Sequence, residues 1–378
     1  MKISYVTTYN ASDLHSWSGL GYMIGKALKD QNNEIDYIGD LQVQSDSITR
    51  LKSIFYNKII KKRFDVSREI SVAQGYAKQI TPFISRDADV IFSPGTIPIS
   101  LLETKKPKIF YTDATFAGLI DFYLSSATLS KETIKHANYL EQQALQTSSL
   151  AIYSSDWAAK TAIENYDVDP SKIKIVPFGA NIDCNRDLVE IKSIVSARSS
   201  KECHLLFLGV DWNRKGGDMA IKVADKLNKM GLKTILNIAG IRNVPCDNLP
   251  NFVINHGFIS KSNKDGSDTI DKLFSQCHFL ILPTNADCTP VVFSEANSFG
   301  LPCITTNIGG IPTIIKDDIN GKIFPLISNS SSYANYIYSI FNNKKLYNQL
   351  TLSSFNEYES RLNWNIAGKA IMKFINEI

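Results

Sequence analysis

The chain has 378 residues, of which 44% are hydrophobic and 21% are charged, and its formal net charge is +4. This length and composition are typical of a globular protein with two domains. The net charge is too small for the length to indicate nucleic-acid binding, and no apolar run approaches the roughly 20 residues that span a bilayer. Residues 1–10 read as a β-strand and not as a signal peptide, so we expect a cytoplasmic location.

The six cysteines have no paired spacing, and the five histidines do not accompany them. The sequence therefore indicates neither a zinc site nor a disulfide framework. We expect the cysteines to be reduced thiols that are mainly buried.

The amino-terminal half opens with a strand at Ile3 to Tyr9, a helix at Leu20 to Lys29 and a strand at Glu34 to Ile38. This order predicts a doubly wound α/β domain. Gly19 and Gly21 precede or open the helix, and glycines let a backbone approach a ligand closely. A dinucleotide-binding fingerprint is excluded because about ten residues separate the glycines from the strand. A plain loop before a helix is the alternative.

The stretch 51–64 is basic and carries Ile54, Phe55, Ile59 and Ile60 at helical spacing. Such a helix can lie on an anionic membrane surface, or it can be an ordinary solvated helix with an apolar face. We favour the solvated helix, and a peripheral contact of 51–64 with a membrane stays open as the other hypothesis.

Two further strands are predicted at Asp89 to Phe92 and at Lys108 to Tyr111, and each ends in a polar loop. The second loop contains Thr112 and Asp113. Ligands of open α/β sheets bind at the carboxyl ends of the strands, so Asp113 is a candidate site residue. Strands at residues 151–153 and 173–176 complete the domain.

The polar run 177–201 is interpreted as a connection between domains. The second domain begins with a strand at His204 to Gly209, which is followed by Arg214 and Lys215 and a helix. Two cations at a helix start oppose the helix dipole, so a bound anion explains them better than stability does. Arg grips phosphate oxygens with two donors, and Lys adds a compact charge. A solvated basic turn is the alternative.

A strand, loop, helix and strand are predicted over residues 279–305, with Thr289 as the helix N-cap and Pro290 as the first helical residue. The amides of Val291 and Val292 would have no partner within the helix, and such an end binds anions. Two acids bracket this helix start, because Asp287 precedes it and Glu295 follows eight residues later. A turn residue and a helix-surface charge are the alternative interpretation.

The run from Asp287 to Glu295, followed by Gly300-Leu301-Pro302, resembles the Glu, seven residues, Glu signature of the family 4 retaining glycosyltransferases, with Asp in the first position. Further segments match motifs of that family in the same order along the chain: Gly19 to Gly21, Thr112-Asp113 and Arg214-Lys215.

The resemblance implies the α/β GT-B fold, which has two doubly wound Rossmann-like domains facing across a cleft. Residues 1–180 would form the acceptor-side domain and 200–361 the nucleotide-sugar-binding domain. Residues 362–378 would form a helix that crosses back onto the first domain.

The resemblance also implies roles for residues. Asp287 would orient the donor sugar, and Glu295 would hold the ribose. Asp113 would contact the sugar or the acceptor, because Thr112 stands where the family often has a histidine. Neither a metal nor a separate cofactor is implied, since positive groups would take the charge of the leaving phosphate. The donor-binding residues implied are Gly19, Gly21, Arg214, Lys215, Ile259, Val291, Val292 and Glu295.

We therefore expect a retaining, metal-independent glycosyltransferase that moves a hexose from a UDP- or GDP-sugar to a saccharide, lipid-linked or protein acceptor in glycan or glycoconjugate synthesis. It would be cytoplasmic or peripheral at the inner face of a membrane. Three alternatives stay open: an inactive nucleotide-binding scaffold of the same fold, a sugar-binding protein with two α/β domains, and a sugar epimerase of the same fold.

Overall fold

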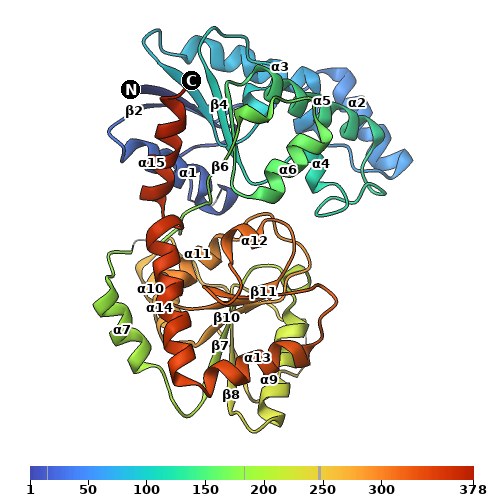
Figure 1. Cartoon of the computed structure of the whole chain (residues 1–378). Helices are drawn as coiled ribbons and strands as arrows, with labels where there is room; N and C mark the ends of the chain where they lie inside the picture. Colours follow the sequence, from blue (N-terminus) through green and yellow to red (C-terminus); the bar gives the residue numbers. More distant parts are fainter. Residues whose placement is uncertain (15, 183, 246–247) are drawn as a thin grey trace. The chain divides into compact units, whose positions relative to one another are not determined.

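The computed structural model describes the whole chain except residues 15, 183, 246 and 247 (Figure 1). The chain forms two compact units. Met1–Pro177 and Trp364–Ile378 make the first unit, and Phe178–Asn363 makes the second. Of the cysteines, Cys246 lies outside the described residues, and the other five are free thiols.

The first unit is built on a six-stranded parallel sheet with the strand order β2-β1-β3-β4-β5-β6. Helices lie on both faces of the sheet, so its central strands are continuous apolar runs, as burial on both faces requires. The strands are β1 (Lys2–Val6), β2 (Glu34–Ile38), β3 (Val90–Ser93), β4 (Lys108–Thr112), β5 (Leu150–Tyr153) and β6 (Ile173–Ile175). The helices are α1 (Leu20–Lys29), α2 (Ser47–Ile54), α3 (Ile70–Ile80), α4 (Phe116–Leu119), α5 (Lys131–Thr147), α6 (Asp156–Asn165) and α15 (Trp364–Ile375).

The carboxyl-terminal helix α15 packs against α1 within the first unit. Gly368 makes this contact close, because a Cβ added there would lie 2.7 Å from the carbonyl oxygen of Ala27. The last residues of the chain therefore complete the unit that the first residues begin.

The second unit has a six-stranded parallel sheet with the order β12-β11-β10-β7-β8-β9. Its core is formed by the strands and the apolar sides of the surrounding helices. The strands are β7 (Cys203–Leu208), β8 (Thr234–Ala239), β9 (Val253–Asn255), β10 (Phe279–Leu282), β11 (Cys303–Thr306) and β12 (Gly321–Phe324). The helices are α7 (Leu188–Ala197), α8 (Trp212–Lys215), α9 (Gly217–Lys229), α10 (Lys264–Gln276), α11 (Val291–Asn297), α12 (Ile311–Ile314), α13 (Ser330–Phe341) and α14 (Lys344–Arg361).

Each sheet has one place where the direction of strand succession reverses. In the first unit it lies between β1 and β3, and in the second between β7 and β10. The loops that leave the two strands diverge at such a point and open a crevice at the carboxyl edge of the sheet, where ligands of this architecture bind. The predicted fold class, two doubly wound α/β units, is confirmed.

Three local predictions differ from the structure. The run 177–201 is not a plain connection, because Asp187 caps the helix α7 with both halves of a capping box and Ile191 is buried. Pro290, in extended conformation, occupies the N-cap position of α11, and the hydroxyl of Thr289 donates instead to the carbonyl of Cys288. The stretch 51–64 is not one regular helix, because α2 gives way to a π-helical turn, η2 (Phe55–Ile60).

Within the described residues, no helix combines the length and the apolar character that crossing a membrane requires.

Candidate active site

The loops after β7 and β10 are joined at the switch point of the second unit. The carbonyl of Arg214 accepts hydrogen bonds from the hydroxyl of Thr284 (2.9 Å) and the amide of Asn285 (2.7 Å). The Arg214 guanidinium in turn donates to the carbonyl of Ala286 at 2.9 Å. Residues about 70 positions apart in the sequence therefore form one rigid surface.

The short helix α8 directs Lys215 into this surface. Asp211 caps the helix by accepting from the amide of Arg214 at 3.0 Å, and Gly216 ends it with φ at 78°. A Cβ at Gly216 would lie 2.1 Å from the carbonyl oxygen of Pro283, so only glycine fits between α8 and the end of β10. This turn leaves the Lys215 side chain buried.

The carboxylate of Asp287 lies between two cations. Its Oδ2 is 2.6 Å from Nζ of Lys215, and its Oδ1 is 3.4 Å from Nη1 of Arg214. Asp287 is only 5% exposed, so these charges interact with little screening by water. Together the three side chains carry one net positive charge. The structure thus brings three of the predicted site residues together.

Glu295, on α11, is paired with a different cation. Its side chain is 3% exposed, and Oε2 lies 2.5 Å from Nζ of Lys261 in the loop between β9 and α10. Sequence reasoning missed Lys261, because a lysine in the polar run 260–265 carries no motif. Val291 and Val292 are the first two residues of α11, so their amides have no acceptor within the helix.

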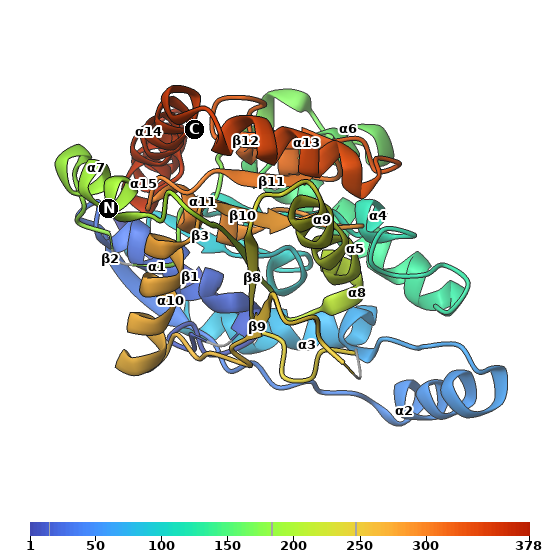
Figure 2. The same ribbon diagram turned by 90° about the horizontal axis from the view of Figure 1, so that it is seen from below.

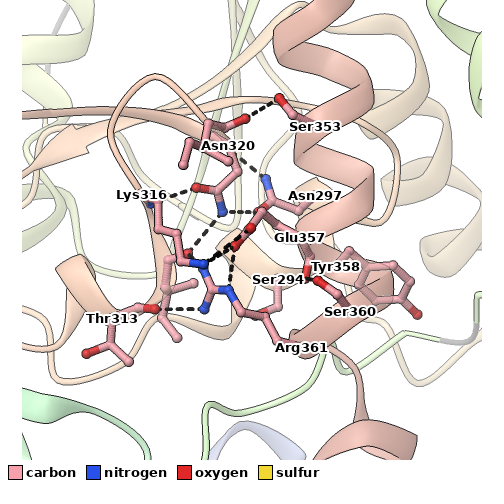
Figure 3. A network of polar contacts seen from close by, with 12 residues as sticks. Ser294, Asn297, Thr313, Lys316, Asn320, Ser353, Glu357, Tyr358, Ser360 and Arg361 are labelled. Atoms are coloured by element: carbon pink, nitrogen blue, oxygen red, sulfur yellow. Dashed lines mark hydrogen bonds and ion pairs between the residues drawn. The ribbon is translucent and has the colours of Figure 1, made fainter.

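A buried amide pair fixes the end of α11 (Figure 3). The side chains of Asn297 and Asn320 are both fully buried, and Asn320 Nδ2 donates to Asn297 Oδ1 at 2.7 Å. Asn320 also donates to the carbonyl of Ile314 (2.9 Å) and accepts from the amide of Lys316 (2.7 Å). The helix that carries Glu295 is therefore held from behind by directional bonds.

The same network reaches α14 through an ion pair (Figure 3). Arg361 donates to the carbonyls of Thr313 (2.8 Å) and Ile314 (2.7 Å) and pairs with Glu357, which also lies 3.1 Å from Nζ of Lys316. Burial would raise the pKa of Glu357, but the bonds from Arg361 and Lys316 outweigh it and lower that pKa. Glu357 therefore stays ionised and keeps its ion pairs with Arg361 and Lys316 behind the site.

Phe258, the neighbour of the implied donor-binding residue Ile259, lines a pocket of about 420 Å³ at the carboxyl ends of β7 and β8. Its lining includes Val210, Arg242 and Phe258, and the Arg242 guanidinium lies 5.1 Å from the centre of the Phe258 ring. Ile259 packs against the core of the second unit. The sequence analysis did not select Arg242, although its place just after the strand β8 is a signal that could have found it.

The first unit has a pocket of about 390 Å³ at its own switch point, lined by the ends of β1, β3 and β4. The predicted residue Asp113 lines it, together with Glu141 from α5, which the sequence analysis did not select. Glu141 Oε2 accepts from the hydroxyl of Thr96 at 2.8 Å. Within the described part of the chain, its buried Oε1 and the buried hydroxyl of Ser93 have no hydrogen-bond partner.

Burial raises the pKa of Glu141 to about 7, and the hydrogen bond from Thr96 opposes that rise only in part. The pocket also has apolar walls, formed in part by the rings of Trp17 and Phe116. Polar groups without partners beside aromatic rings suit a ligand that has both hydroxyl groups and C–H surfaces.

Gly19 and Gly21, which the resemblance implies to bind the donor, are both required by the local structure of the first unit. Gly19, with φ at 79°, lies just before α1 in a conformation that favours glycine. Gly21 packs under Tyr9, because an added Cβ would lie 2.2 Å from the Tyr9 hydroxyl oxygen, and its carbonyl accepts from Tyr5 at 2.6 Å. Neither glycine is among the residues that line the pocket of the first unit.

Residues 190–354 match the sequence family described as glycosyl transferases group 1. A Klebsiella pneumoniae protein described as an uncharacterized 41.2 kDa protein in cps region is 26% identical over 233 residues, which are 59% of this chain and 59% of that protein. A D-inositol 3-phosphate glycosyltransferase of Mycolicibacterium paratuberculosis is 21% identical over 188 residues, which are 48% of this chain and 42% of that enzyme. This chain thus matches less than two thirds of the length of either relative.

Solved glycosyltransferases share the fold. Sucrose-phosphate synthase from Thermosynechococcus elongatus aligns over 100% of this chain and 98% of its own, with a TM-score of 0.70 and 12% identity. Anabaena HepE in complex with UDP aligns over 100% of both chains, with a TM-score of 0.66 and 13% identity. WaaG, a glycosyltransferase involved in lipopolysaccharide biosynthesis, has a TM-score of 0.65 at 14% identity, over 97% of this chain and 98% of its own. The predicted GT-B fold is confirmed.

We expect Asp287→Asn to lower the melting temperature and to make the protein more responsive to anions. Removing one partner of a buried ion pair costs about 3 to 5 kcal/mol, and pyrophosphate can supply the missing negative charge. Thermal melting with and without pyrophosphate, at equal ionic strength, measures both effects. The control is Asp211→Asn, because Asp211 is half exposed beside Arg214 and asparagine can still cap α8. Equal pyrophosphate shifts in the two variants would contradict the arrangement.

Glu141 should make stability depend on pH. Its folded pKa, about 7, is above the value of 4.5 for a free glutamate, so ionisation opposes folding as the pH rises from 4.5 through 7. Relative to wild type, Glu141→Gln should therefore gain about 2.5 kcal/mol of stability between pH 5 and pH 8. Urea unfolding across this range measures the difference, with the exposed residue change Glu103→Gln as control. Parallel pH profiles of wild type and Glu141→Gln would refute the assignment.

Proposed function

We propose that this chain, whose residues 190–354 belong to the glycosyl transferases group 1 and whose fold is GT-B, is a retaining glycosyltransferase that uses a nucleotide diphosphate sugar. The observation that carries the proposal is the group of Arg214, Lys215 and Asp287 at the switch point of the second unit. A group with a net positive charge at this edge of a doubly wound sheet suits a ligand with a diphosphate.

In this proposal the donor diphosphate replaces Asp287 as the partner of the two cations. Arg214 and Lys215 turn to the phosphate oxygens, aided by the first amides of α11. The carboxylate of Asp287 is then released to accept hydrogen bonds from hydroxyl groups of the donor sugar. Glu295, held by Lys261, accepts from the ribose hydroxyls, and the base lies in the pocket beside Phe258 and Ile259.

The cations also account for the chemistry. As the bond between the sugar carbon and the phosphate oxygen breaks, negative charge grows on the leaving diphosphate, where Arg214 and Lys215 stabilise it. This arrangement supplies the positive charge without a divalent metal. The acceptor hydroxyl attacks from the face that the diphosphate leaves, and the leaving phosphate oxygen takes its proton. The configuration at the sugar carbon is thereby retained.

The acceptor would occupy the pocket of the first unit. Asp113, Ser93 and Glu141 offer hydrogen bonds there, and Trp17 and Phe116 offer apolar surface. This mixture suits the hydroxyl groups and C–H faces of a saccharide, free or carried by a lipid or protein. We place the reaction in glycan or glycoconjugate synthesis, on the cytoplasmic side.

A nucleotide-binding scaffold without turnover is the second candidate. It is favoured by Thr112, which replaces the histidine of the resembling family, and by Asp287, which is shorter than glutamate and paired with Lys215. Such a protein would bind the donor without cleaving it. Binding and turnover must therefore be measured separately.

Donor binding and hydrolysis across UDP, GDP and ADP sugars test the proposal. We expect one donor to bind and to be hydrolysed slowly, equally with and without EDTA. Glu295→Ala should weaken binding at least about tenfold, since a buried carboxylate that accepts from hydroxyls is lost. Asp225→Ala, a change at a partly exposed acid on α9 that pairs with Lys229, is the control. Failure to bind any of these donors would sink the proposal, and binding without hydrolysis would favour the scaffold.

Variants of Asp287 separate its role in turnover from donor affinity. Asp287→Ala should lower kcat by more than it weakens donor binding, because the carboxylate would act on the sugar after the cations have moved to the diphosphate. Asp287→Glu should keep activity, since the carboxylate is retained with longer reach. Turnover in Asp287→Ala equal to that of wild type would exclude the role proposed for this residue.

A further inference from the structure

Residues 47–61, named here the arm, expose a continuous apolar surface. The arm consists of α2 and the π-helical turn η2, and it lies on a long excursion from β2, away from the sheet of the first unit (Figure 2). Leu51 is 66% exposed and Ile59 is 67% exposed. Thr49 is the only buried residue of α2, and η2 has none. The exposed apolar side chains are Ile48, Leu51, Ile54, Phe55, Ile59 and Ile60.

Two polar side chains of the arm, Thr49 and Lys52, face the protein. Thr49 is buried, and Lys52 forms ion pairs with Glu132 and Glu69. Asn57 accepts from the amide of Phe64 at 3.1 Å. An ordinary surface helix turns its apolar stripe to the core, whereas the arm leaves its apolar stripe exposed. The apolar side chains of the arm therefore do not pack on the core of the first unit.

The π-helical turn keeps the apolar surface in one stripe. Ile48, Leu51 and Phe55 share a face of α2 at helical spacing. A continued α-helix would rotate Ile60 toward the protein, but the wider turn, closed by the amide of Lys61 on the carbonyl of Tyr56, leaves it exposed. Such π-helical turns are rare and occur frequently at functional sites.

Hydrogen bonds fix the chain at both ends of the arm. Asp46 caps α2 by accepting from the amide of Thr49 at 2.7 Å. Beyond the arm, the amide of Arg63 donates to the carbonyl of Thr128 (2.7 Å), and the amide of Ser130 donates to the carbonyl of Arg63 (2.9 Å). The apolar stripe is therefore held in place before any partner arrives, which lowers the entropic cost of binding.

Charge indicates the partner. Residues 47–63 contain no Asp or Glu, and the exposed cations beside the stripe include Arg50, Lys58 and Lys61. An aliphatic stripe flanked by cations matches the acyl boundary and the phosphates of an anionic bilayer. We propose that the arm docks the protein on the surface of an anionic lipid membrane, with the stripe inserted and the cations at the headgroups.

Two other occupants fit less well. A second copy of the chain, paired by a two-fold axis, would bring the cations of both arms together, and like charges oppose such a contact. Protein interfaces are enriched in aromatic residues, Met and Arg, whereas five of the six side chains of the stripe are aliphatic. The docking surface is independent of the donor site, so its test does not depend on activity.

The test is cosedimentation of the full chain with vesicles. We expect binding to equimolar phosphatidylglycerol and phosphatidylcholine, and little binding to phosphatidylcholine alone. Lys58→Gln with Lys61→Gln should weaken binding about 25-fold, at roughly fivefold for each lysine. Leu51→Ser with Ile59→Ser should weaken it about tenfold or more, because both inserted side chains are lost.

Matched controls change the same residue types elsewhere in the first unit. Phe83→Ser with Ile163→Ser removes two exposed apolar side chains, and Lys78→Gln with Lys105→Gln removes two exposed cations. These variants should bind vesicles like wild type, and all variants should keep the melting temperature.

Three results would overturn the proposal. The first is absence of wild-type binding to the anionic vesicles, and the second is an equal loss of binding in the control variants. The third is a wild-type dimer, seen by light scattering, that Leu51→Ser with Ile59→Ser dissociates, because the stripe would then belong to a second copy of the chain.

Discussion

The ion pairs of Asp287 with Lys215 and Arg214 are the constraint on which the arrangement of the second unit's site depends. Lys215 is buried, and a buried cation must find an anion. The pairing joins the loop after β7 to the loop after β10, two segments about 70 residues apart in the sequence. In the absence of ligand, Asp287 supplies the negative charge that we assign to the donor diphosphate.

The buried acid of the first unit, Glu141, has a different environment. Glu141 has a hydroxyl partner on one oxygen and, among the residues that the structure describes, no partner on the other, and burial raises its pKa to about 7. A carboxyl group in this state can donate or accept a hydrogen bond at little cost in charge. The charged group of the second unit and the nearly neutral pocket of the first therefore suit different ligands, a diphosphate in one case and hydroxyl groups in the other.

Rigidity links the site to the rest of the second unit. The buried amides of Asn297 and Asn320 hold α11, and Arg361 and Glu357 connect that support to α14. Because each of these groups is buried or paired, a shift of α11 would leave polar atoms without partners. The position of Glu295 is thus set by residues that never approach the ligand in our proposal.

The sequence by itself determined many of the helices and strands and the order in which the site residues follow them. The segments Leu20–Lys29 and Glu34–Ile38 were predicted with the bounds that the structure has, because apolar periodicity and flanking turn residues are local properties. Parallel strands end at one edge of a sheet, so the sequence also placed Asp113, Arg214, Lys215 and Asp287 at those edges.

Only the tertiary structure decided which side chains meet and which way they face. Lys261 meets Glu295 across 34 residues, and Thr96 meets Glu141 across 45, and no local pattern encodes such pairs. The arm is the clearest case. A helical period defines an apolar stripe but not the direction in which the stripe points, because that direction depends on the contacts that the opposite side makes. The burial of Thr49 and the ion pairs of Lys52 set which side of the arm faces the protein, and the apolar side is left exposed.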